Sequence, residues 1–161
     1  MTYESGKKTG SKDHMVWEGF TERQHYCVGQ YISHMAEALG LGNWHLILAT
    51  EPCDNEDAMA QVLTTEGRHV AKIRLNKEWM SYSLDDKRHT VVHELLHLYF
   101  DPLTEALRLM LPHSGVGFAL SGMINEAVRQ AEELSVDDLA YVFVRYANDE
   151  GVRHYLEGRK R

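Results

Sequence analysis

The chain has 161 residues, enough for one domain with its own hydrophobic core. Hydrophobic residues make up 43% of it and charged residues 25%, which excludes an intrinsically disordered chain. The formal net charge is −7 with histidine neutral, so we expect no nucleic-acid partner. Because neither a signal peptide nor an apolar run of membrane-spanning length is recognisable, we expect a cytoplasmic protein with no membrane partner.

The first predicted elements are a tail and a helix. Residues 1–15 are polar and predict a flexible N-terminal tail, which leaves residues 16–158 as a single domain. Thr21 and Gln24 have the spacing of a capping box and predict a helix start. Gly40 then favours the end of that helix.

A short sheet is expected next. Residues 44–50 (WHLILAT) predict a strand, and residues 58–65 and 68–75 predict the two arms of a β-hairpin around a glycine-containing turn. In the second arm apolar residues alternate with polar ones, which is typical of a sheet covered on one face. This arm is either a plain structural strand or the edge strand along which an extended peptide lies.

The second half of the chain is predicted to be helical. Ser83 is a good N-cap for a helix that should end near Asp101-Pro102. A further helix is expected over residues 118–134, and Ser135 should cap the last one. Helix, small sheet and several helices in this order predict an α+β fold.

The stretch VVHELLHL (residues 91–98) carries the clearest chemical signal. On a helix, His93 and His97 project side by side, so both imidazoles can reach one metal ion at about 2.0–2.1 Å. Glu94 can reach a water on that ion without binding the ion itself, and can act as general base. The HExxH spacing therefore predicts one Zn²⁺ ion and hydrolysis by an activated water.

The motif alone leaves an ordinary explanation open. A shuffled copy of this chain would contain HExxH roughly once in eighteen cases, so two histidines hydrogen-bonded inside a core remain an alternative. The aliphatic neighbours predict a buried helix, and buried polar groups need partners. The extended zinc-binding pattern HExxHxxGxxH and the HxxxHxxxxxH pattern of metal-dependent ribonucleases both require a histidine at position 103. This position is Leu103 here, so both patterns are excluded.

Downstream, residues 121–127 read SGMINEA. Together with HELLH this stretch resembles the thermolysin-like zinc metallopeptidases, or gluzincins, and in size the small single-domain minigluzincins. The resemblance implies a zincin-like domain: an N-terminal helix, a short antiparallel sheet with a hairpin, an active-site helix and a helical C-terminal half. It also implies that Glu126 is the third zinc ligand and Glu94 the base of a peptidase, expected to be an endopeptidase.

Two features depart from the family pattern. The family's aspartate four residues after the ligand glutamate is replaced by Gln130, so Asn125 and Gln130 are the candidates for orienting the ligands. The residue that stabilises the oxyanion has no recognisable motif. Its candidates are Tyr99, His113, Tyr141, His154 and Tyr155.

Several alternatives remain open from the sequence. Glu133 replaces Glu126 as third ligand if the helix is displaced by two turns; otherwise Glu132-Glu133 and Asp137-Asp138 form a solvated face. We expect a monomer acting on a peptide or protein substrate. The alternatives are a zincin-fold module that binds metal and a partner without cleavage, and an SprT-like DNA-associated protease.

Overall fold

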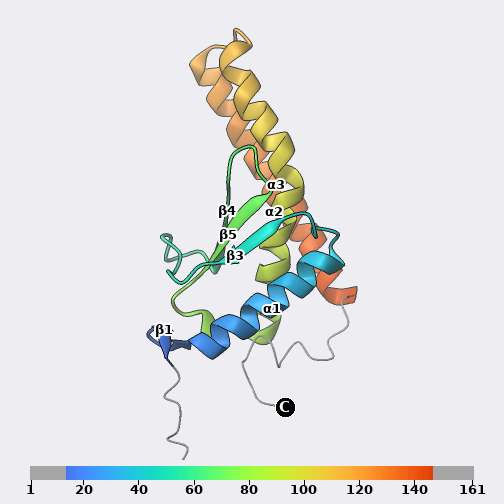
Figure 1. The fold of residues 1–161 in the computed structure, drawn as a ribbon. Helices are drawn as coiled ribbons and strands as arrows, with labels where there is room; N and C mark the ends of the chain where they lie inside the picture. Colours follow the sequence, from blue (N-terminus) through green and yellow to red (C-terminus); the bar gives the residue numbers. More distant parts are fainter. Residues whose placement is uncertain (1–13, 147–161) are drawn as a thin grey trace, which may run out of the picture.

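A computed structural model of the chain describes residues 14–146, and these form an α+β arrangement (Figure 1). Two long helices, α2 and α3, run side by side as a hairpin that extends beyond a small sheet, while α1 crosses at the other end of the sheet (Figure 1). Most of the predicted N-terminal tail, together with His154 and Tyr155, lies outside the described residues.

The N-terminal segment confirms the predicted helix start. Strands β1 (Met15–Trp17) and β2 (Phe20–Thr21) form a small antiparallel pair ahead of helix α1 (Glu22–Ala38). Thr21 is the N-cap, and its side chain and that of Gln24 close the capping box. After α1, Gly40 adopts φ 76°, a conformation that other residues rarely accept.

The main sheet has three strands: β3 (His45–Leu48), β4 (Ala60–Thr64) and β5 (Val70–Leu75). Strands β4 and β5 form the predicted antiparallel hairpin, but β3 pairs with β5 in parallel. The sheet is therefore mixed, and the expectation of an antiparallel sheet is wrong for β3. The strand order is β3-β5-β4, so β5 is central. The suggestion that residues 68–75 form an edge strand is therefore wrong, and the edge strand of the hairpin is β4.

Helix α2 (Leu84–Met110) begins at the predicted N-cap, Ser83, but does not end at Pro102. Proline lacks the N–H that would bond to the carbonyl four residues earlier, and this usually ends or kinks a helix. Here the helix continues for two more turns, and the Thr104 hydroxyl donates to the Phe100 carbonyl at 2.9 Å. Contacts with neighbouring elements outweigh the local signal.

Helix α3 (Phe118–Tyr146) is continuous, so the predicted break at Ser135 is also wrong. The Ser135 hydroxyl donates to the Ala131 carbonyl at 2.7 Å and stays within the helix instead of capping a new one. Two short 3-10 turns complete the described chain, η1 (Trp79–Ser81) before α2 and η2 (Leu111–His113) between α2 and α3.

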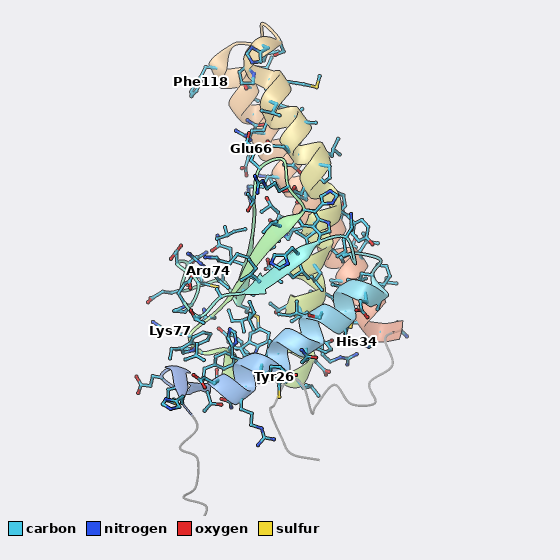
Figure 2. The ribbon with its side chains drawn as sticks, in the orientation of Figure 1. Tyr26, His34, Glu66, Arg74, Lys77 and Phe118 are labelled. Atoms are coloured by element: carbon cyan, nitrogen blue, oxygen red, sulfur yellow. The ribbon has the colours of Figure 1, made fainter. Side chains whose placement is uncertain are left out.

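Polar contacts at regular intervals tie α2 to β4 and the turn after it. The residues on α2 are seven apart, which is two helical turns, and their partners along the strand are two apart, so each series presents one face. Figure 2 shows Glu66, at the end of this series, beside the α2–α3 hairpin. The pairs are Glu94 with the Val62 N–H (2.7 Å), Asp101 with the Thr64 hydroxyl (2.6 Å), and Arg108 with Glu66 (3.0 Å).

The core lies where α1, the inner face of the sheet and the first half of α2 meet. Ala71, Ile73 and Leu75 of β5 are buried as their alternation predicts, and Val136 and Ala140 fasten α3 to this core. Between residues 14 and 146, no helix combines the length and the apolar character needed to cross a membrane.

Replacing Leu98 by alanine should lower the free energy of unfolding by about 2–5 kcal/mol, because this side chain is 1% exposed and its loss leaves a cavity. Leu103→Ala, five residues later on the same helix but 67% exposed, is the control and should change it by less than about 0.5 kcal/mol. Chemical denaturation followed by circular dichroism measures both. Equal effects would contradict the burial of α2 described above.

Candidate metal centre

Three potential ligand atoms converge between α2 and α3. The Nε2 atoms of His93 and His97 are 3.1 Å apart. The Oε2 atom of Glu133 lies 3.6 Å from Nε2 of His93 and 3.9 Å from Nε2 of His97. Among the described residues this group is the one set of three with metal-binding side chains whose ligand atoms approach in this way.

The other nitrogen of each imidazole is held by a carboxylate on α3. Nδ1 of His93 is 2.8 Å from Asp137, and Nδ1 of His97 is 2.8 Å from Glu132. Glu132 also accepts a hydrogen bond from the Thr104 hydroxyl at 3.2 Å. These bonds fix how both rings are rotated, which is how proteins commonly orient metal-binding histidines.

When both imidazoles are neutral, only lone pairs remain at the point of convergence. An ionised carboxylate cannot donate, so Nδ1 of each ring carries the hydrogen, and Nε2 of the neutral ring is then an acceptor. With the Glu133 oxygen, three acceptors face one another, an arrangement that is repulsive without a cation between them. Zinc bound by three tetrahedrally placed ligands would hold them roughly 3.4 Å apart, close to the observed separations. The residues therefore fit one such ion.

The electrostatic surroundings favour a neutral His93. Burial lowers the pKa of His93, and the neighbouring His97 lowers it further, while Asp137 acts in the opposite direction. A neutral imidazole is the form that binds metal.

Glu94 stands beside this group without belonging to it. Its carboxylate accepts the Val62 N–H of β4. Burial raises the pKa of Glu94 to about 7, although His97 and the Val62 N–H both act to lower it. A carboxylate with this pKa can accept and return a proton near neutral pH.

The group opens into a cavity of about 750 Å³ walled by α2, α3 and the edge strand β4. His89, one turn before His93, lines the same cavity, and the two rings are 6.2 Å apart between centroids. Neither ring nitrogen of His89 has a hydrogen-bond partner within residues 14–146. The sequence interpretation did not single out this histidine, although its spacing of four from His93 was the available signal.

Glu126 does not join the histidines. It is exposed on α3, and hydrogen bonds from Arg129 (2.8 Å) and Gln130 (2.8 Å) hold its pKa at about 2. Glu133 lies seven residues, or two turns, further along the same side of α3 (133 − 126 = 7). The carboxylate beside the histidines is therefore the one first considered only as an alternative.

The predicted supporting residues also lie elsewhere. Asn125 is exposed and does not line the cavity, and Gln130 contacts Glu126 instead of a histidine. Tyr99 is exposed on α2, with its hydroxyl directed toward Gly40. His113 lies in η2, at the turn between the two long helices, and Tyr141 lines a second cavity of about 490 Å³.

The orienting carboxylates Glu132 and Asp137 were expected on a solvated face. Asp137 is indeed 61% exposed in its side chain, yet it binds His93, so exposure alone did not indicate its role. The signal that would have found it is spacing. Asp137 follows Glu133 by four residues, the separation between ligand and orienting aspartate expected from the gluzincin resemblance.

Comparisons with known proteins add no further constraint. No family model, no curated protein and no solved structure matches the chain.

Zinc affinity distinguishes the two carboxylates. Glu133→Ala should weaken zinc binding by at least about a hundredfold, because a lost ligand should cost no less than a lost orienting residue. Glu126→Ala should leave the affinity within about threefold of wild type, since that carboxylate faces Arg129 and Gln130. Competition with a chromogenic chelator measures both affinities. The reverse ranking would return the third position to Glu126.

Proposed function

We propose that the protein is a zinc-dependent peptidase of the gluzincin type, with His93, His97 and Glu133 as metal ligands and Glu94 as general base. The observation that carries this proposal is the convergence of three acceptor atoms beside a buried carboxylate at an open sheet edge. The order of elements, a helix, a hairpin and the HExxH helix, supports a zincin-like relationship. A cytoplasmic location remains a prediction.

Each group of the chain has a distinct task in this proposal. Glu132 and Asp137 accept hydrogen bonds from Nδ1 of the two imidazoles, which fixes the rotation of both rings and points Nε2 of each toward the ion. When bound, zinc would supply Lewis acidity that lowers the pKa of water toward about 7. Glu94 takes the proton from the attacking water and returns it to the leaving amine, a role that matches its raised pKa.

The edge strand suggests a peptide as substrate. Met59 and Thr65, on either side of β4, bond their backbone groups to the β5 side. Successive residues of a strand point their backbone N–H and C=O groups to opposite sides. The backbone groups of Ala60, Val62 and Thr64 therefore point away from β5. The Val62 N–H already meets Glu94 on that side. An extended peptide lying along β4 would add a strand and bring its backbone to the cavity.

We assign His89 as the hydrogen-bond donor to the substrate carbonyl oxygen. This oxygen gains negative charge during attack, and a donor fixed in a cavity stabilises that charge. His89 lines the cavity and has no competing partner among the described residues. His93 and His97 cannot take this part, because Nδ1 of each ring bonds to a carboxylate and Nε2 of each ring would bind the ion.

The central test is Glu94→Gln. The amide retains the shape of the side chain but cannot accept the proton, so kcat on casein or a quenched peptide library should fall by about 10²–10⁴-fold. Zinc content, measured by atomic emission, should stay at one ion per chain. Undiminished turnover would refute the role of Glu94. A wild-type protein that holds zinc yet cleaves neither substrate would favour the module that binds metal without catalysis.

Replacing His89 tests the donor separately. His89→Ala should reduce kcat by about 10²–10³-fold while leaving zinc affinity and KM nearly unchanged, because the contact strengthens only as charge develops. His89→Gln, which keeps a donor, should recover part of the rate. His45→Ala, an exposed histidine on β3, is the matched control. An active wild type with an unaffected His89→Ala variant would assign the donor to another residue.

A further inference from the structure

One side chain with a permanent positive charge lines the site cavity among the residues that the structure describes, Arg129 of α3. It precedes Glu133 by four residues, about one helical turn, so the two side chains leave α3 on the same side. The pKa of Arg129 is raised, mainly by its hydrogen bond to Glu126 and further by the charge of Glu133. The guanidinium therefore stands beside the carboxylate assigned as third ligand.

Arg129 keeps donors for a further partner. Its Nε and Nη2 atoms bond to Glu126 at 3.1 and 2.8 Å, which engages two of the five N–H groups of a guanidinium. The remaining three (5 − 2) have no hydrogen-bond partner within residues 14–146. Gln130 also donates to Glu126 at 2.8 Å, so this carboxylate is anchored and fixes how the guanidinium is turned. An arginine held in this way is suited to bind a second carboxylate.

The neighbouring carboxylates of the cavity do not take up these donors. Asp101 accepts a hydrogen bond from the Thr64 hydroxyl at 2.6 Å, and Glu132 accepts one from His97 at 2.8 Å. The third ligand faces the two imidazoles. A carboxylate that enters the cavity from outside therefore has no competitor at the free side of Arg129.

We propose that Arg129 binds a carboxylate of the substrate, so that the site selects acidic peptides; this inference rests on the proposed peptidase function. Helices α2 and α3 run antiparallel (Figure 1), so Arg129 lies toward the α2–α3 turn and His89 toward the opposite end of the cavity. An extended peptide advances about 3.3 Å per residue, and a helical turn rises about 5.4 Å. The bound carboxylate therefore belongs one or two residues from the scissile bond, on the side away from His89.

The charge of the surroundings makes this arginine decisive. Apart from histidines, the other charged side chains that line the cavity are carboxylates, and the chain has a net charge of −7. Such a surface repels acidic peptides unless a fixed cation offsets it. The side chain of Arg129 is 60% exposed, so solvent screens the new ion pair, and we expect a preference of about three- to tenfold.

Cleavage of matched peptide libraries tests the inference. Quenched, amidated octapeptides with Glu at one fixed position and neutral residues elsewhere are compared with the same libraries carrying Gln, and mass spectrometry locates the cuts. Wild type should show a kcat/KM about three- to tenfold higher for Glu than for Gln at a position within two residues of the cut. A Gln library with a free C-terminus distinguishes a terminal carboxylate from an acidic side chain as the group that is bound.

Variants of Arg129 assign the preference. Arg129→Gln should bring the ratio of Glu to Gln cleavage to about one, and Arg129→Lys, which keeps the charge without the planar fork, should retain part of it. Arg23→Gln makes the same charge change on α1, outside the cavity, and should keep the wild-type ratio. Circular dichroism checks that each variant is folded.

Binding without cleavage separates this inference from the proposed function. Equilibrium dialysis of the libraries against zinc-loaded Glu94→Gln protein should enrich the peptides that carry a carboxylate by about three- to tenfold, and adding Arg129→Gln should abolish this enrichment. Enrichment beside a wild type that cleaves nothing would refute the peptidase and leave the carboxylate site standing. Equal binding of charged and neutral peptides would overturn the proposal. So would an enrichment that survives Arg129→Gln, since the carboxylate would then bind the metal.

Discussion

The register between α2 and α3 determines what stands at the candidate site. His93 and His97 lie 17 and 13 residues before Met110 (110 − 93 and 110 − 97), and Glu133 lies 15 residues after Phe118 (133 − 118). In an antiparallel hairpin, equal distances from the turn bring residues to the same level. Two turns of α2 beyond Pro102 therefore place Glu133, and not Glu126, opposite the histidines.

The same register concentrates carboxylates around two imidazoles. Glu132, Glu133 and Asp137 come from α3 and Glu94 comes from α2, so the site carries more negative charge than its own hydrogen bonds offset. Glu132 is largely shielded from water, whereas Glu133 and Asp137 remain partly exposed, and gathering these like charges costs free energy unless a positive charge joins them. This free energy mainly weakens the contact between α2 and α3, because three of the four carboxylates lie at that contact.

The local parts of the fold were predictable, and the contact between distant parts was not. Thr21 and Ser83 identified helix starts, and the alternation through Ile73 identified a strand, since each signal depends only on neighbouring residues. The helix end at Pro102 and the third ligand Glu126 share one cause. If α2 ended at Pro102, the turn would come earlier and the residues near 126 would lie opposite the histidines. Contacts with β4 and the turn after it stabilise the continued helix, and no local sequence pattern predicts these contacts.

The inner face of α3 is occupied largely by the polar groups of the candidate site. Because that inner face presents Glu132, Glu133 and Asp137 toward the histidines, fewer positions remain for the apolar contacts that fasten one helix to another. Beyond the sheet the hairpin depends mainly on the pairing of α2 with α3, and isolated helical pairing is marginal without a buried apolar face. The hydrogen bonds from the two imidazoles of α2 to Glu132 and Asp137 of α3 therefore supply part of the contact that apolar packing would otherwise provide.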